Sequence, residues 1–347
     1  MTTKGYSSYH GRMSGRKIAL IVVLALVLVG AVAYLVLQNY VVYDESGNAK
    51  IEVPFFQKKE KKERQDNDAA DGPGDRDDLV DTVEPEHPHV KVAALHGVRL
   101  PDDCLWWGAN YIMDTLAPED MVLAVKRTTG GITYGTSVAT PAGVVVETGR
   151  PLDCLKTLLG SGRYTVGQIV CFQDSAYSRA KPDAALVRED GALWYDGEGQ
   201  SWLDPTSAET LGYITALVKE CGELGFREVL LDRFCYPGGD TSGIANGAED
   251  RVQVLTDFAE KLRGALPEGV ALSVVVRDTE SLSVAQMAEL FDRLYVPAER
   301  AAAVKVALPE GYDPETRVVV MAAEAQSGSY VVCLLYTSPS PRDYAAS

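Results

Sequence analysis

The amino-acid sequence predicts an α/β protein whose main domain is a (β/α)8 barrel. From residue 89 onward, short β-rich segments alternate with segments whose apolar residues recur every three or four positions. Such alternation is typical of parallel strands joined by helices. The region spans about 240 residues, close to the size at which such a sheet closes into a barrel. In addition, Asp232 and Arg233 directly follow a buried strand, at the sheet edge where parallel barrels carry their chemistry.

Seven strands can be placed in this region. They are residues 90–98, 121–126, 166–172, 226–232, 270–276, 294–297 and 317–322. We expect a TIM-type barrel that spans residues 89–332 and is truncated near its last unit.

Three helices between these strands have recognisable ends. The segment 206–224 has Asp204 as its predicted N-cap and Gly225 as its C-terminal stop. A second helix is expected over 250–266, where apolar residues keep the helical period. A third is expected to begin at Ser283, because a Gln three residues later completes a capping box.

The N-terminal part of the chain predicts a membrane anchor. Residues 18–37 carry no charge over a length that spans a bilayer. Basic residues precede this run and acidic residues follow it, so residues 1–17 are expected in the cytoplasm and the barrel outside the cell. A cleaved signal peptide is the alternative, since Ala-Val-Ala at 31–33 fits a cleavage site. The apolar run continues to Leu37, which favours a retained single-pass anchor.

Two further segments are not expected to belong to the fold. Residues 38–88 are rich in charge and poor in large apolar side chains, which predicts a flexible linker. At the other end, CLLYTSPSPRD (333–343) matches one translation of a transposase adapter used in preparing sequencing libraries. Residues 333–347 are therefore expected to be a non-native tail, the alternative being a disordered Ser/Pro-rich end.

Composition narrows the classes of ligand. The formal net charge is −16, which disfavours binding to nucleic acid. Six cysteines lack the Cys-x-x-Cys spacing of a metal site, and the four histidines form no cluster. We therefore expect neither a metal nor a cofactor.

Alternation along the strand that ends at Asp232 places Glu228, Leu230 and Asp232 on one face. If that face is the barrel interior, Asp232 lies at the catalytic rim and Glu228 lies low, in a structural position. Asp232 could instead cap a helix or loop, or pair with Arg233. By alternation Arg233 points away from the barrel and is expected to anchor the loop.

Acidic and aromatic side chains gather in the segment before this strand. Asp190-Gly191 between strand-like arms predicts a hairpin, and Trp194 and Trp202 then lie near several acids. Rings that stack on sugar C–H faces, beside carboxylates that accept hydroxyl hydrogens, suit a carbohydrate ligand. The alternative is a packed excursion whose aromatic side chains cover the barrel edge, which suits Trp202 better than Trp194.

Residues 175–237 resemble a bacterial family of putative glycosyl hydrolase domains with a TIM-barrel fold, related to barrels that degrade polysaccharides. The resemblance rests on Lys181-Pro182-Asp183, on Trp202-Leu203-Asp204-Pro205 before a helix, and on Leu224-Gly225-Phe226 before a strand ending in Asp232. It is specific over 166–237 and weaker over the rest of 90–332.

The chain also departs from the family pattern. The family arginine after the aspartate is absent from its place, Arg127-Thr128-Thr129 stands where relatives carry acids, and Val275 replaces an expected acid. Asp232 remains as one catalytic carboxylate, and Asp278 is the first choice for the second because it follows the next strand. The other candidates for this second carboxylate are Asp174, Glu299 and Glu324.

The resemblance thus implies a membrane-anchored, extracellular glycoside hydrolase-like barrel that acts on a cell-surface or environmental polysaccharide or oligosaccharide. The expected substrate-binding residues are Trp194, Asp174, Arg233 and Tyr236. The altered acids favour a rival function, in which a degenerate barrel binds glycan or a cell-wall partner without cleaving it. A purely structural envelope protein is a third possibility.

Overall fold

The computed structural model describes residues 89–116, 120–145, 149–248 and 250–334, together with two short strands nearer the N-terminus. The chain divides into two compact units, Met1–Val80 and Asp81–Ser347. In the first unit, β1 (Val41–Tyr43) pairs antiparallel with β2 (Ala49–Ile51), within the range predicted as linker. The predicted membrane segment 18–37 lies outside the described residues, as does 335–347. None of the helices that the structure describes is long and apolar enough to cross a bilayer.

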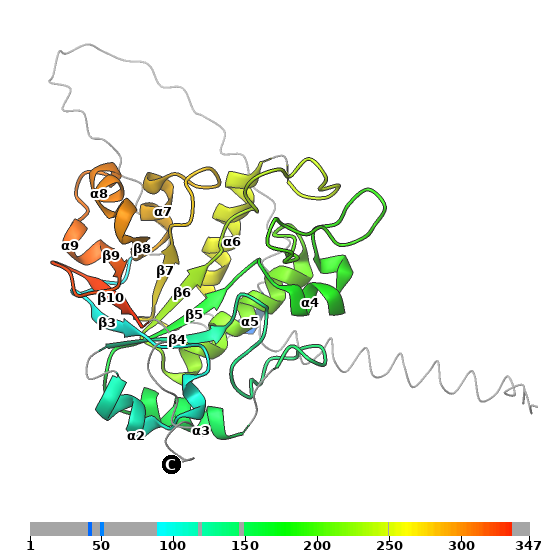
Figure 1. Cartoon of the computed structure of the whole chain (residues 1–347). Coiled ribbons are helices and arrows are strands. Elements are labelled where there is room, and N and C mark those ends of the chain that lie inside the picture. Colours follow the sequence, from blue (N-terminus) through cyan, green and yellow to red (C-terminus); the bar gives the residue numbers. More distant parts are fainter. Residues whose placement is uncertain are drawn as a thin grey trace, which may run out of the picture. The chain divides into compact units, whose positions relative to one another are not determined.

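The second unit contains a closed barrel of eight parallel strands, as the sequence predicts. The strands follow one another around the barrel in chain order, and the last pairs with the first. In Figure 1 these two strands, β3 in cyan and β10 in red, lie side by side. The strands are β3 (His96–Arg99), β4 (Asp120–Lys126), β5 (Thr165–Val170), β6 (Glu228–Asp232), β7 (Ala271–Val275), β8 (Arg293–Pro297), β9 (Val318–Ala322) and β10 (Tyr330–Cys333).

The eighth strand, β10, includes the first residue of the predicted tail. Cys333, the first residue of the predicted non-native segment, is the last residue of β10 and pairs with Arg99 of β3. Because β10 also pairs with β9, its four residues close the barrel. The connection from β9 to β10, residues 323–329, contains no helix, so the last repeat is abbreviated there.

Helices connect the strands and surround the barrel (Figure 1). The three helices predicted from the sequence are found as α5, α6 and α7, and the capping box at Ser283 is present. The helical segments are η2 (Cys104–Trp106), α2 (Ala109–Tyr111), η3 (Ile112–Leu116), α3 (Arg150–Leu159), α4 (Ser175–Ala180), η4 (Pro182–Ala184), α5 (Ala208–Leu224), α6 (Arg251–Ala265), α7 (Val284–Leu290), α8 (Ala298–Ala307) and α9 (Pro314–Arg317).

The start of α5 differs from the prediction. Its N-cap is Ser207, and the predicted cap Asp204 lies in the turn before it. The Asp204 carboxylate accepts the backbone N–H of Thr206 at 2.8 Å and a side-chain N–H of Asn246 at 2.9 Å. These bonds hold Asp204 in the loop. The predicted end is correct, because Gly225 adopts a φ of 105°, which a glycine tolerates.

The barrel interior is filled in layers, and the alternation predicted for β6 is confirmed. Leu230 belongs to a cluster of eight buried side chains, one from each strand or its immediate start: Leu95, Val122, Val166, Leu230, Val275, Tyr295, Val319 and Val331. Next to this cluster Glu228 forms a buried ion pair with Arg293 and accepts the hydroxyl of Tyr295 at 2.9 Å. Glu228 is therefore structural, and Asp232 lies two residues above Leu230, at the mouth.

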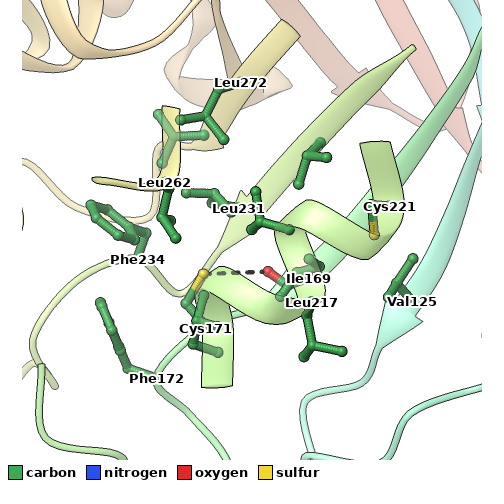
Figure 2. Close-up of a cluster of buried hydrophobic side chains, with 14 of the residues drawn as sticks. Val125, Ile169, Cys171, Phe172, Leu217, Cys221, Leu231, Phe234, Leu262 and Leu272 are labelled. Atoms are coloured by element: carbon green, nitrogen blue, oxygen red, sulfur yellow. Dashed lines mark hydrogen bonds between the residues drawn. The ribbon is translucent and has the colours of Figure 1, made fainter. Parts of the chain in front are cut away.

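A second apolar layer lies between the barrel and its helices. Val229 and Leu231, the outward residues of β6, belong to it. Figure 2 shows Leu217 and Cys221 of α5 and Leu262 of α6 beside side chains of β5, β6 and β7. Each such Leu, Val or Phe contributes roughly 1.5–3 kcal/mol when fully buried, so this layer holds the helices on the barrel and fixes the loops at its mouth.

Candidate functional site at the barrel mouth

A pocket of about 260 Å³ opens at the carboxyl ends of the strands. Every strand of the barrel contributes to it, either by its own last residues or by the residues that directly follow. The lining residues are Arg99, Asp102, Ala124, Lys126, Arg127, Thr128, Gln168, Val170, Asp232, Arg277, Pro297, Met321 and Cys333. Because parallel barrels carry their chemistry at this end, the pocket is the candidate functional site.

Asp232 lies at the centre of the polar contacts in this pocket. Arg277 donates to both of its oxygens, from Nε to Oδ1 and from Nη2 to Oδ2, each at 2.7 Å. Oδ1 also accepts the backbone N–H of Arg233 at 2.8 Å, and Oδ2 accepts a side-chain N–H of Gln168 at 2.9 Å. A carboxylate has about four acceptor positions, so all of those on Asp232 are occupied.

These contacts fix the charge state of Asp232. Burial by itself would raise the pKa of this carboxyl, but the hydrogen bonds and the positive charge of Arg277 outweigh it. The pKa of Asp232 is therefore held below its ordinary value, and the group is an ionised carboxylate at neutral pH. Such a group can act as a nucleophile, a base or an electrostatic partner, but it holds no proton to donate.

The contacts continue from Asp232 across the mouth to β3. Gln168, which donates to Asp232, accepts from Arg99 Nε at 2.8 Å. Arg99 in turn donates from Nη2 to Asp102 Oδ1 at 2.9 Å, and Arg127 Nη2 donates to the main-chain oxygen of Asp102 at 3.0 Å. Asp102 is the second carboxylate that lines the pocket. One connected set of polar contacts thus spans β3, β5, β6 and the end of β7.

A buried ion pair supports the floor of the pocket beside this set. Lys126 Nζ lies 3.0 Å from Asp174 Oδ2, and both side chains are fully buried. Asp174 also caps α4 by accepting the N–H of Tyr177 at 2.7 Å. Gly130 packs directly on this carboxylate, since a Cβ at Gly130 would lie 1.7 Å from Asp174 Oδ1. Asp174, predicted to bind substrate, therefore acts beneath the pocket through Lys126, which does line it.

The residue after Asp232 has an unusual backbone. Arg233 has a φ of 51°, and it is the one non-glycine residue with positive φ in the part of the chain that the structure describes. Branched and long side chains adopt this region at a cost of about 1–2 kcal/mol. The turn aims the Arg233 N–H at Asp232 and interrupts the strand alternation from which the direction of its side chain was predicted.

The structure places the other predicted acids away from the pocket. Asp278 accepts the backbone N–H groups of Glu280 and Ser281, at 3.1 and 3.2 Å, and so organises the loop after β7. Glu299 is exposed in the first turn of α8, and Glu324 is exposed after β9. None of the three lines the pocket. The mouth thus brings Asp232 together with Asp102, a residue that sequence reasoning did not single out.

The predicted aromatic side chains are buried and do not line the pocket either. Trp194 is 7% exposed and belongs to the outer apolar layer, next to Gly243. Tyr236 is covered by Arg251, whose guanidinium carbon lies 4.7 Å from the ring centroid, and burial raises the pKa of its hydroxyl to about 12.

The loop that carries these aromatic residues is built around Asp196. The carboxylate of Asp196 accepts from Trp202 Nε1 at 2.7 Å and from Gln173 at 2.9 Å. Burial raises the pKa of Asp196, but its hydrogen bonds outweigh that effect and lower it overall. The predicted hairpin at Asp190-Gly191 is present, since Arg188 and Ala192 bond across it at 2.8 Å.

Five polar side chains of the mouth were missed in the sequence: Arg99, Asp102, Lys126, Gln168 and Arg277. A signal was present for three of them. Lys126 and Gln168 are polar residues at inward positions of apolar strands, and Arg277 follows a strand as directly as Arg233 does. Their meeting around Asp232 depends on the register between strands, which the sequence does not display.

Comparisons with known proteins identify a family for this chain. The family model described as "Putative glycosyl hydrolase domain" matches residues 111–289, just over half of the 347-residue chain. No curated protein matches the chain.

Solved structures that match this chain include three from different organisms. A hypothetical protein from Ruminiclostridium thermocellum is 23% identical with a TM-score of 0.41, over 53% of this chain and 98% of that chain. A variant of the alpha-galactosidase AgaA from Geobacillus stearothermophilus, in complex with stachyose, is 10% identical with a TM-score of 0.47, over 74% and 42%. Aspergillus fumigatus Ega3, in complex with galactosamine, is 12% identical with a TM-score of 0.38, over 68% and 78%. Similarities of this size assign no activity.

Proposed function

Because the chain belongs to the family described as "Putative glycosyl hydrolase domain", we propose that its barrel mouth binds and hydrolyses a glycan, with Asp232 as the essential carboxylate. One observation carries this proposal. Asp232 is an ionised carboxylate held at the carboxyl end of β6, in a pocket to which all eight strands contribute. Buried charge in this position costs stability and is commonly retained for chemistry.

Hydrolysis of a glycosidic bond requires two carboxyl groups, one ionised and one able to give a proton. Asp232 suits the ionised role, in which it attacks the sugar or stabilises the positive charge that develops on it. The other carboxyl group that lines the pocket among the described residues is Asp102, and it could take the second role only when its ion pair with Arg99 opens. Asp278, the choice made from the sequence, faces its own loop instead.

A second function, glycan binding without cleavage, is favoured by the saturation of Asp232. Its two oxygens already accept four hydrogen bonds, so an attack on a sugar requires one donor to leave. Arg277 is the donor able to do so, since its side chain is 36% exposed. If Arg277 stays bound, the mouth is a binding site alone.

We place the barrel outside the cell, tethered by a retained anchor at 18–37 and a linker over 38–88. The uncharged run of residues and its basic N-terminal flank support this proposal. Protease added to intact cells should then digest the barrel while the anchor stays with the membrane. If the barrel resists the protease in intact cells but is digested after detergent lysis, the barrel lies inside the cell.

The hydrolase proposal is tested by measuring released reducing ends and glycan binding for the purified full-length protein against a panel of polysaccharides. Asp232→Asn should reduce hydrolysis by orders of magnitude, and Asp278→Asn, outside the pocket, should retain it. A wild type that releases no reducing ends, but binds glycan roughly tenfold more tightly than Asp232→Asn, would establish the binding function. Unchanged activity and binding with a lower melting temperature would make Asp232 purely structural and end both proposals.

A further inference from the structure

The charge of the mouth is opposite to that of the chain. The chain carries a formal net charge of −16, yet its pocket is lined by four cationic side chains and two carboxylates. The cationic residues are Arg99, Lys126, Arg127 and Arg277. The lining thus carries more positive than negative side chains, and a concave site with an excess of one sign of charge attracts ligands of the other sign.

Three of the four cations are neutralised by carboxylates of this chain. Lys126 pairs with Asp174 at 3.0 Å and Arg277 with Asp232 at 2.7 Å, while Arg99 pairs with Asp102 at 2.9 Å. The bidentate contact of Arg277 removes most of the repulsion that Asp232 would exert on an anion. The floor of the pocket is therefore close to neutral, which leaves the fourth cation to set its net charge.

That fourth cation is Arg127. Its Nη2 donates to the main-chain oxygen of Asp102 at 3.0 Å, and no carboxylate of the described residues lies within ion-pair distance. Its Nε is shielded from solvent and has no hydrogen-bond partner among the same residues. A buried guanidinium N–H without an acceptor is unfavourable. A ligand oxygen that accepts a hydrogen bond from Arg127 would remove this cost.

We infer that the mouth takes a sugar that carries a carboxylate, a uronic-acid unit, and that Arg127 binds this carboxylate. The inference rests on the proposed function and names its substrate class. A planar guanidinium binds a planar carboxylate through two parallel bonds, and Arg127 offers such a group at the pocket, where its shielded Nε takes part once the side chain turns toward the cavity. The cavity of about 260 Å³ is at the small end of ligand pockets, which limits it to about one sugar unit.

Uronate oligosaccharides and their methyl esters provide the test, because esterification removes the charge and keeps the ring. Titration calorimetry would compare trimers of galacturonate, glucuronate and mannuronate, each against its methyl ester, on the full-length protein. At least one acid trimer should bind about tenfold more tightly than its ester, with a preference that weakens as salt is added. Equal affinities for acid and ester in all three pairs would overturn the inference.

Variants then assign the preference to Arg127. Arg127→Gln should abolish the preference for the acid over its ester. Arg127→Lys keeps the positive charge but loses the two parallel N–H donors, so it should keep part of the preference. Arg188→Gln, at an exposed pair with Asp190, is the matched control and should bind as wild type does. A full preference in Arg127→Gln, in a variant that melts as wild type does, would assign the charge selection elsewhere and defeat the inference.

The same experiment distinguishes a sugar site from a simple anion site. It also distinguishes failure of the inference from failure of the hydrolase proposal. Acetate and inorganic phosphate alone are titrated as well, and if either binds as tightly as the best trimer, the mouth is a simple anion site and the sugar assignment fails. Neutral glycans that are cleaved with no charge preference would leave the hydrolase proposal standing while the inference falls. If a uronate binds selectively through Arg127 but Asp232→Asn affects no glycan, the inference stands and the hydrolase proposal falls.

Discussion

Arg277 and Asp232 face each other across neighbouring strands, joined by two parallel hydrogen bonds of 2.7 Å. Both lie beyond the last backbone pair of the β6–β7 ladder, which joins Leu231 to Val274. The ion pair therefore holds the two strand ends together where the backbone no longer does. If Asp232 acts as proposed, the same contact also controls whether its carboxylate can reach a ligand.

Removing Arg277 should destabilise the barrel. Arg277→Met leaves a buried carboxylate with its remaining two donors, and breaking a buried pair costs about 3–5 kcal/mol. Because Arg277 is 36% exposed, solvent reduces this to roughly 1–3 kcal/mol of unfolding free energy, measured by urea denaturation. Arg188→Met, at a surface pair with Asp190, should cost less than about 0.5 kcal/mol. Equal costs for the two variants would contradict the structural role of the pair.

Acid should unfold the protein through its buried carboxylates. The pKa of Asp292 is lowered, because its bonds to His89 and Arg263 outweigh the effect of burial. A depressed folded-state pKa adds stability that is complete above the ordinary pKa of about 3.9 and is lost as pH falls through the folded value. The melting temperature should therefore drop below about pH 4, and Asp292→Asn should flatten that drop. An unchanged slope in the variant would show that other groups control the transition.

Adding a side chain at Gly130 should destabilise the protein. It has a φ of +91°, and a Cβ there would lie 1.7 Å from Asp174 Oδ1, in the buried pair with Lys126. Gly130→Ala should cost about 2–4 kcal/mol by thermal unfolding, from backbone strain plus displacement of Asp174. Gly143→Ala isolates the strain, since Gly143 has a φ of +86° and nothing within 4 Å, and should cost only about 1–2 kcal/mol. Matching losses in the two variants would show that the contact with Asp174 is unimportant.

Arg233→Gly should separate backbone strain from function. Glycine accepts the φ of 51°, so the variant should unfold up to about 1 kcal/mol less readily, while losing any contact of Arg233 with glycan. Calorimetric melting and glycan titration on the same sample would measure both. A lower melting temperature would mean that the Arg233 side chain contributes more to the fold than its backbone costs.

Ending the chain after Leu334 should preserve folding, whereas ending it after Ser329 should not. The longer form keeps β10, whose Val331 belongs to the buried cluster inside the barrel. The shorter form opens both β3 and β9, and circular dichroism should show loss of the cooperative melting transition. Similar melting of the two forms would show that β10 is dispensable.

Sequence patterns predicted the parts of this structure that depend on residues close together in the chain. The period-2 alternation of β6 placed Glu228, Leu230 and Asp232 correctly, and the cap at Ser283 and the stop at Gly225 follow from side-chain and backbone chemistry within one turn. The strand β10 was not predicted, because four residues show too little periodicity and because its last residue begins the adapter-like run.

Contacts between distant segments could not be foretold in the same way. Arg277 meets Asp232 across 45 residues, and which side chain after β7 reaches the mouth depends on the turn of that loop. Asp278, one position later, was the residue chosen from the sequence, but it bonds to its own loop. Similarly, Asp174 follows β5 as an acid at a strand end should, yet it turns under the pocket to cap α4 and pair with Lys126.

The pairing of β3 with β10 sets the order in which the domain can assemble. Leu95 bonds to Ser329 at the base of this seam, and the two residues lie 234 positions apart. At synthesis rates of about 5–20 residues per second, β3 waits on the order of 10–50 s before its partner exists. During that time an open strand edge can capture another chain. Both strands of the seam are only four residues long, which keeps that edge short until the circle closes.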